Sequence, residues 1–147
     1  MGPAACLALG LSTGVACAAV IYGTSGPDVL NGTNNNDEIY GYEGRDTIQG
    51  FEGQDYIEAS FDADDIGGGI GSDGIIGGPG DDTIDGRDGP DNVVAGAGSD
   101  IIRGGANDDT LNVRGDGNDT AYGELGTDTC VYTLFQDTLY GCEVFVT

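Results

Sequence analysis

The sequence contains no histidine and no lysine, and its only basic residues are four arginines, against 26 acidic residues. The formal net charge of -22 argues against nucleic acid or anionic membranes as partners, because both require basic surface. Without histidine the chain lacks the commonest general base and the usual ligands for zinc. It also contains no Gly-x-Ser-x-Gly motif, no P-loop and no complete EF-hand loop. We therefore expect no catalysis and no zinc, and we expect other cations to be the natural partners.

Residues 1–18 have a different composition from the rest of the chain. They contain no acidic residue, consist mainly of small and apolar residues, and end in Ala16-Cys17-Ala18. A small-x-small ending of this kind is typical of a signal-peptide cleavage site. We therefore predict a signal peptide over 1–18 and a secreted protein, with a lipid anchor through Cys17 as the minor alternative. The segment is too short and too rich in glycine to predict a transmembrane helix, so no membrane insertion is expected.

A nine-residue unit recurs from residue 23 onward, which places the chain among repeat proteins. The eighth position is aliphatic in each of the first ten units. An extra residue near Val113 shifts the frame, and two weaker units with Asp119 and Asp128 follow it. Matches of this regularity indicate a repeat fold rather than a disordered acidic tract. The sixth position of the ten regular units is always aspartate: Asp28, Asp37, Asp46, Asp55, Asp64, Asp73, Asp82, Asp91, Asp100 and Asp109.

Each position of the unit has a physical interpretation, which the segment GGPGDDTID at 77–85 shows most clearly. Glycine at positions one, two and four would allow positive φ angles and a tight turn with its carbonyl groups pointing inward. Asp62 at position four and Ala59 at position one depart from the pattern. The last three residues suit a very short strand whose middle side chain points inward. Stacking of such units would align the inward side chains into continuous rows.

The pattern Gly-Gly-x-Gly-x-Asp-x-aliphatic-x resembles the RTX, or haemolysin-type, nonapeptide repeat. Residues 68–76 and 77–85 match it at every defined position, and the resemblance covers 23–131. It implies an all-β fold, a parallel β-roll or β-solenoid in which two units form one turn. It also implies a secreted bacterial protein with calcium ions between successive turns along both edges. On this resemblance one edge would carry Asp28, Asp46, Asp64, Asp82 and Asp100, and the other Asp37, Asp55, Asp73, Asp91 and Asp109.

The residue chemistry favours calcium as well. Ca²⁺ takes about six to eight hard oxygen ligands in flexible geometry, whereas Mg²⁺ demands a rigid octahedron and retains its water. We expect up to about eight calcium ions, each held by two aspartates of successive turns and by turn carbonyl groups. Without metal, the rows of carboxylates should repel one another and hold the chain open. Asp119 and Asp128 are further candidate ligands, and the candidate carbonyl donors are Gly44, Gly53, Gly71, Gly80, Gly89 and Gly98.

The C-terminal segment has few turn residues and contains two of the four cysteines, Cys130 and Cys142. In an exported chain two such cysteines usually form a disulfide, although two free buried thiols are the alternative. We predict a β-roll over 19–131 and a disulfide-linked cap over 132–147 that covers the open end of the roll. The extra residue near Val113 is expected to end the regular array of sites.

Taken together, these features predict a secreted calcium-binding repeat protein that is folded and stabilised by Ca²⁺ and has no catalysis of its own. The alternative is an accessory or structural module of a secreted enzyme or adhesin, or a surface polysaccharide-binding protein. An extracellular polymer or a cell-surface component is a possible partner in either case.

Overall fold

The computed structural model describes residues 17–132 and 136–146, with the side chains of 144–146 outside that description. Nearly all of the predicted signal peptide therefore lies outside the described residues, as do 133–135 and 147 of the predicted cap. The described residues contain strands and turns but no helix, and so no helix that could cross a membrane.

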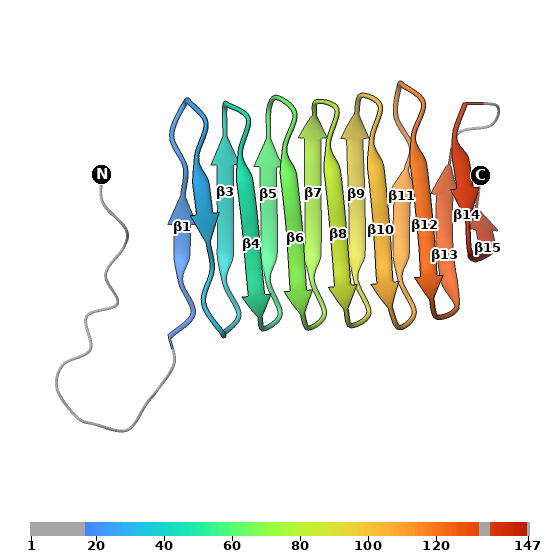
Figure 1. The fold of residues 1–147 in the computed structure, drawn as a ribbon, viewed down its shortest axis with the longest axis horizontal. Coiled ribbons are helices and arrows are strands. Elements are labelled where there is room, and N and C mark those ends of the chain that lie inside the picture. Colours follow the sequence, from blue (N-terminus) through green and yellow to red (C-terminus); the bar gives the residue numbers. More distant parts are fainter. Residues whose placement is uncertain (1–16, 133–135, 147) are drawn as a thin grey trace, which may run out of the picture.

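The chain coils into a flat ladder in which odd-numbered and even-numbered strands form two separate parallel sheets (Figure 1). The eight-stranded sheet contains, in spatial order, β1 (Val20–Tyr22), β3 (Glu38–Tyr42), β5 (Tyr56–Ser60), β7 (Gly74–Pro79), β9 (Asn92–Ala97), β11 (Thr110–Val113), β13 (Asp128–Tyr132) and β15 (Cys142–Val146). The seven-stranded sheet contains β14 (Thr138–Tyr140), β12 (Thr120–Leu125), β10 (Ile101–Ala106), β8 (Thr83–Asp88), β6 (Asp65–Ile70), β4 (Thr47–Glu52) and β2 (Val29–Asn31).

Two nonapeptides make one turn of this solenoid. Ile48 pairs with Ile66, and Ile66 pairs in turn with Ile84, so equivalent residues are in register along each sheet. Each strand is hydrogen-bonded to the strands one full turn before and after it, which is why neighbours in a sheet are never consecutive in sequence. The predicted all-β parallel β-roll is confirmed.

The core between the two sheets consists mainly of the eighth residue of each unit, together with Ala59, Ala95 and Val113. Along β3, β5 and β7 these residues are Ile39, Ile57 and Ile75, each fully buried. Their neighbours in sequence point outward, as the two-residue alternation of strands requires. One aliphatic side chain per unit therefore suffices for a core because stacking places it directly above its equivalent. The same cluster contains Leu30, Ile48, Ile66, Ile84, Val93, Ile102, Leu111, Ala121 and Cys130.

In the units from Gly41 to Asn112 the turns have positive φ at positions two and four, but not at position one, where positive φ was also expected from the sequence. Gly78 and Gly80 have φ of 114° and 159°, whereas Gly77 is not among the residues with positive φ. Position one is restricted by space instead: a Cβ at Gly77 would lie 2.5 Å from Asp82 Oδ2 and 2.5 Å from the carbonyl oxygen of Ala95. Asp62, which replaces glycine at position four, adopts φ 75°.

Many strands are longer than the three residues predicted. β8 runs from Thr83 to Asp88 and so includes the first three residues of the following unit. The ladder continues through these residues because Arg87, at position two, stays in register with Gly69 and Gly105 despite its φ of 81°. The pairing skips Gly86 and resumes in the same register at Arg87 and Asp88.

The sheets and the rows of aspartates continue past the extra residue near Val113. Val113 remains in register with Tyr132, and Ile101 pairs with Thr120, so the turn between β11 and β12 absorbs the insertion. Asp119 therefore follows Asp100 in its row.

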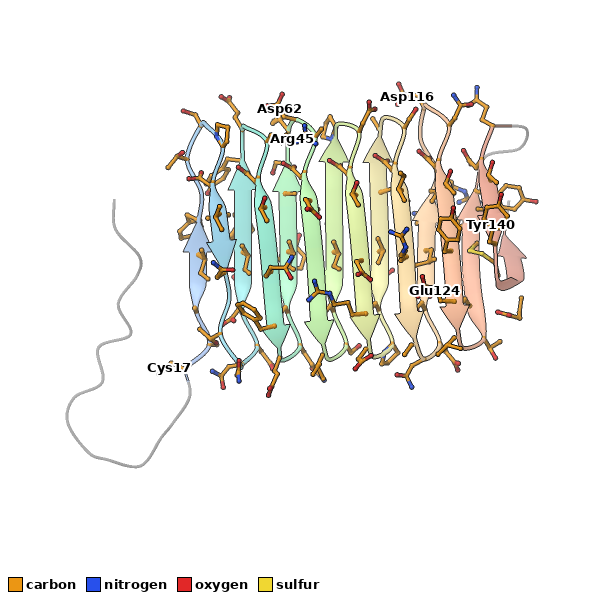
Figure 2. All side chains as sticks on the ribbon, in the orientation of Figure 1. Cys17, Arg45, Asp62, Asp116, Glu124 and Tyr140 are labelled. Carbon is orange, nitrogen blue, oxygen red and sulfur yellow. A yellow bond between two sulfur atoms is a disulfide. The ribbon has the colours of Figure 1, made fainter. Side chains whose placement is uncertain are left out.

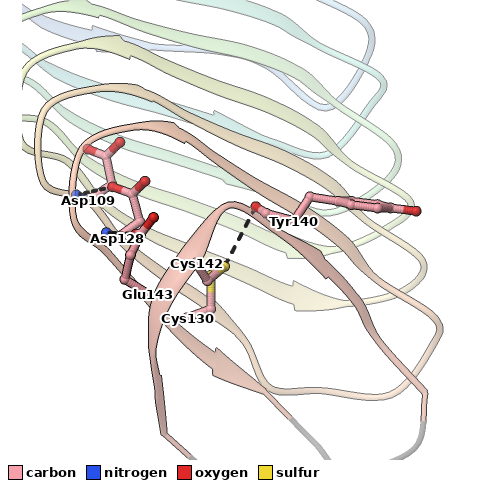
Figure 3. Close-up of a disulfide and its surroundings, with 6 residues drawn as sticks. All are labelled: Asp109, Asp128, Cys130, Tyr140, Cys142 and Glu143. Carbon is pink, nitrogen blue, oxygen red and sulfur yellow. Dashed lines mark hydrogen bonds between the residues drawn. A yellow bond between two sulfur atoms is a disulfide. The ribbon is translucent and has the colours of Figure 1, made fainter.

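The C-terminal segment continues both sheets. β14 pairs with β12 and β15 pairs with β13, each in parallel. The predicted disulfide is present: Cys130 and Cys142 are joined across β13 and β15, with their Cα atoms 5.8 Å apart (Figure 3). Cys130 is fully buried and Cys142 packs against the core, so the link fastens β15 onto the end of the roll.

Candidate metal site

The aspartates at position six form two rows, one at each edge of the ladder, and all of them except Asp128, the first residue of β13, stand immediately before a strand. Figure 2 labels Asp62 in a turn at one of these edges. All of the position-six aspartates from Asp37 to Asp128 are at most 3% exposed, whereas Asp28 is half-buried. The structure thus brings the predicted residues together in the two sets expected. One edge carries Asp28, Asp46, Asp64, Asp82, Asp100 and Asp119, and the other carries Asp37, Asp55, Asp73, Asp91, Asp109 and Asp128.

Each row is held together by one repeated hydrogen bond. The backbone N–H of Asp64 donates to Oδ1 of Asp82 at 2.8 Å, and the backbone N–H of Asp82 donates to Oδ1 of Asp100 at 2.8 Å. The same bond recurs from turn to turn along both edges. One carboxylate oxygen of each aspartate is therefore used to position its neighbour in the preceding turn.

The second carboxylate oxygen has no such partner. Oδ2 is buried and without a hydrogen-bond partner in nine of these aspartates. A buried polar group without a partner costs about 1–3 kcal/mol, and more when it is charged. Two rows of such oxygens therefore destabilise the fold unless something else binds them. The nine are Asp46, Asp55, Asp64, Asp73, Asp82, Asp91, Asp100, Asp109 and Asp128.

The electrostatics of the rows also disfavour ionised carboxylates without a bound cation. Burial raises the pKa of Asp82 and Asp91 to about 7. The backbone N–H of the preceding aspartate in the row lowers the pKa of each carboxyl, but less than burial raises it. Repulsion from the neighbouring carboxylates in the same row adds to the increase. Burial also raises the pKa of Asp55, Asp64, Asp109 and Asp119 to about 6.

Backbone carbonyl groups form further columns beside the aspartate rows. A Cβ at Gly71 would collide with the carbonyl oxygen of Gly53, and a Cβ at Gly89 would collide with that of Gly71. On the other edge the carbonyl oxygen of Gly80 lies in the same way against Gly98. The position-four carbonyls thus point along the stack from one turn to the next, although Asp62 and Asn107 also stand at position four. Gly44, the sixth predicted carbonyl donor, stands at the same repeat position, but a Cβ there would meet the carbonyl carbon of Gly26 rather than its oxygen.

This donor set fits calcium. Among the described residues no group of three or more histidine, cysteine, aspartate or glutamate side chains could hold a metal ion. Two carboxylates from successive turns therefore need backbone oxygens to complete a shell, and the turns provide columns of them. Oxygen donors alone, in a stack with no rigid octahedral arrangement of side chains, match the ligand preference of Ca²⁺. The unpartnered Oδ2 atoms indicate that a cation is needed at the rows, and the oxygen-only donors favour Ca²⁺ among cations.

Comparison with known families gives the same result. The family model of the RTX calcium-binding nonapeptide repeat matches the chain in four copies, at residues 22–57, 41–75, 76–111 and 115–139. The chain belongs to this family. No curated protein matches the chain. As an RTX repeat protein it contains a calcium-binding β-roll.

Three residues at the ends of this RTX roll escaped the sequence analysis. Asp137 continues one row, since the backbone N–H of Asp119 lies 3.4 Å from its Oδ1. Glu143 continues the other by accepting the backbone N–H of Asp128 at 2.7 Å (Figure 3). At the opposite end the N–H of Ala19 donates to Oδ1 of Asp37. Asp137 was detectable, because it follows Asp128 by one repeat and precedes Leu139 at position eight. Glu143 breaks the repeat, and no sequence signal identifies it.

Proposed function

We propose that this protein is a secreted calcium-binding RTX β-roll whose folding depends on Ca²⁺ and which has no catalytic activity of its own. The observation that supports this most strongly is the set of buried, unpartnered Oδ2 atoms along both edges. Bound calcium would supply positive charge between successive turns. The absence of histidine from the sequence favours a non-catalytic role, and the composition of residues 1–18 favours export.

In this proposal Asp64, Asp82 and Asp100 act as bridges along one edge. Oδ1 of each positions the preceding turn, which leaves Oδ2 available for a cation. Carbonyl oxygens at position four, including those of Gly80 and Gly98, would complete the shell. Because each aspartate borders the turns before and after it, removal of one should affect two adjacent sites and leave distant sites intact.

Calorimetric titration of the metal-free full-length chain tests the proposal. We expect several Ca²⁺ ions to bind, and Mg²⁺ to bind more weakly. Asp82→Asn should lose roughly one or two ions, because its carboxylate borders two sites. Asp85→Asn is the matched control, since Asp85 lies on the outer face of β8 beside Arg87 (3.7 Å) and carries the same charge. Unchanged calcium stoichiometry in Asp82→Asn, or equal losses in both variants, would contradict the assignment.

A second candidate function, polysaccharide binding, is favoured by a group of tyrosines on the outer face of the eight-stranded sheet. The rings of Tyr22 and Tyr40 stack at 5.5 Å with an interplanar angle of 15°, and Tyr56 continues the group at 6.0 Å from Tyr40. Stacked rings with polar hydroxyl groups form a surface that is apolar and hydrogen-bonding at once. Co-sedimentation with insoluble cell-wall polysaccharides, compared between the native protein and Tyr22→Ala, distinguishes this function from calcium binding alone.

A further inference from the structure

The first two aspartates of the rows differ from those that follow. Oδ2 of Asp28 accepts hydrogen bonds from the backbone N–H of Thr24 at 2.6 Å and from its hydroxyl at 2.9 Å. Oδ2 of Asp37 accepts hydrogen bonds from the backbone N–H of Thr33 at 2.5 Å and from its hydroxyl at 3.0 Å. Both threonines stand at position two of their units. In these units the oxygen that is unpartnered in nine later aspartates has two donors.

The backbone conformation at position two explains the difference. Thr24 and Thr33 are not among the residues with positive φ, and their N–H groups point at the carboxylate of their own unit. From Tyr42 to Gly105 position two has positive φ in every unit, at Phe51, Ser60, Arg87 and the glycines. The N–H of position two then does not donate to the aspartate of its own unit, and Oδ2 of that aspartate has no hydrogen-bond partner.

Ser60 shows that a hydroxyl alone is not sufficient. It stands at position two of the unit that contains Asp64, with φ 83°, and Oδ2 of Asp64 nevertheless has no hydrogen-bond partner. The backbone direction at position two therefore distinguishes the first two units from this one. In the second unit Asn35 adds to the arrangement, because its Nδ2 donates to the Thr33 hydroxyl at 3.1 Å and so directs the hydroxyl proton toward Asp37.

We propose that threonine hydrogen bonds replace calcium at Asp28 and Asp37, so that the metal array begins with Asp46 and Asp55. The first two units then form a metal-independent start of the roll. They remain connected to the array, because the backbone N–H groups of Asp28 and Asp37 donate to Oδ1 of Asp46 and Asp55 at 2.8 Å. This inference rests on the proposed calcium function, and it narrows which carboxylates serve that function.

The first test compares equivalent substitutions at neighbouring positions of one row. Asp37→Asn should bind as many calcium ions as the native chain, whereas Asp55→Asn should lose roughly one or two. Equilibrium dialysis with radioactive calcium on the full-length protein measures the stoichiometry directly. Loss of as many ions in Asp37→Asn as in Asp55→Asn would overturn the inference while leaving the calcium function intact. If the native chain binds no calcium, the proposed function and this inference both fail.

The second test does not depend on removing a carboxylate. Thr33→Gly deletes the hydroxyl and permits positive φ at position two, and it should release Oδ2 of Asp37 for a cation. We expect a gain of roughly one calcium ion per molecule. Ser60→Gly is the control, because its backbone already has positive φ and Oδ2 of Asp64 is already unpartnered; its stoichiometry should not change. No gain in Thr33→Gly, or an equal gain in Ser60→Gly, would overturn the inference.

Discussion

Removing metal should make the fold depend on pH in a direction opposite to ordinary acid denaturation. The nine unpartnered Oδ2 atoms, at about 1 kcal/mol each as a lower estimate, cost about 9 kcal/mol in the metal-free fold. The net stability of a typical domain is about 5–15 kcal/mol. The metal-free chain should therefore be largely unfolded at pH 8, where these groups are ionised.

Protons should partly substitute for the metal. Burial raises the pKa of Asp82 to about 7, whereas an exposed aspartate has a pKa of about 3.9. Between these values the folded state binds more protons than the unfolded state, so the free energy of unfolding rises as pH falls from 7 toward 4. The difference of about three units corresponds to about 4 kcal/mol for this one carboxyl. Asp91, with a pKa of about 7, contributes in the same direction.

Far-UV circular dichroism of protein freed of divalent ions by a chelating resin measures this effect. We expect a coil-like spectrum at pH 8 and recovery of a β-rich spectrum at pH 5, with calcium restoring the β-rich spectrum at pH 8. A control at pH 8 in about 1 M salt separates surface repulsion from burial, because salt screens exposed charges but not buried ones. A metal-free chain that is equally folded at pH 5 and pH 8, or that folds at pH 8 in salt alone, would refute this reasoning.

Three further predictions concern packing. Gly89→Ala should destabilise the calcium-loaded protein by more than about 2 kcal/mol, because φ is 125° and a Cβ would collide with a carbonyl oxygen of the preceding turn. Gly26→Ala is the control: it lies at the same repeat position, but no atom lies within 4 Å of the added Cβ, so the thermal midpoint should not change. Equal thermal midpoints for Gly89→Ala and Gly26→Ala would contradict this prediction. Ile84→Ala should cost about 2–5 kcal/mol in denaturant unfolding because the side chain is fully buried, whereas Ile70→Ala, 57% exposed, should cost little. Reduction of the disulfide should lower the free energy of unfolding by about 3 kcal/mol, while the number of bound calcium ions stays the same. Loss of bound calcium on reduction would contradict the view that the disulfide and the calcium sites stabilise the protein independently.

The repeat itself was predictable because each feature repeats with the same chemistry. Aspartate and aliphatic residues in phase predicted both the core rows and the two carboxylate rows, and stacking is the only arrangement that buries Ile48, Ile66 and Ile84 together. The structure confirms those parts of the prediction. Spacing alone, however, treats all units as equal.

What the pattern could not reveal depends on backbone direction. Thr33 and Ser60 are chemically similar residues at the same repeat position, yet only Thr33 donates to its aspartate, because φ differs between them. The reason for glycine at position one was also predicted wrongly. A sequence cannot distinguish a glycine that is needed for positive φ from one that is needed because there is no room for a Cβ. At Gly77 the second requirement applies.

The hydrogen bond that links successive aspartates gives the roll a polarity. In every case the N–H belongs to the earlier turn and the carboxylate oxygen to the later one, as between Asp82 and Asp100. A turn that joins the N-terminal side of a formed stack finds its acceptor already in place. A turn that joins the C-terminal side supplies an acceptor but leaves its own aspartate N–H waiting for the next turn. The two ends of the stack therefore need different partners: the N-terminal end needs a donor, which the N–H of Ala19 provides for Asp37, and the C-terminal end needs an acceptor, which Glu143 provides for the N–H of Asp128.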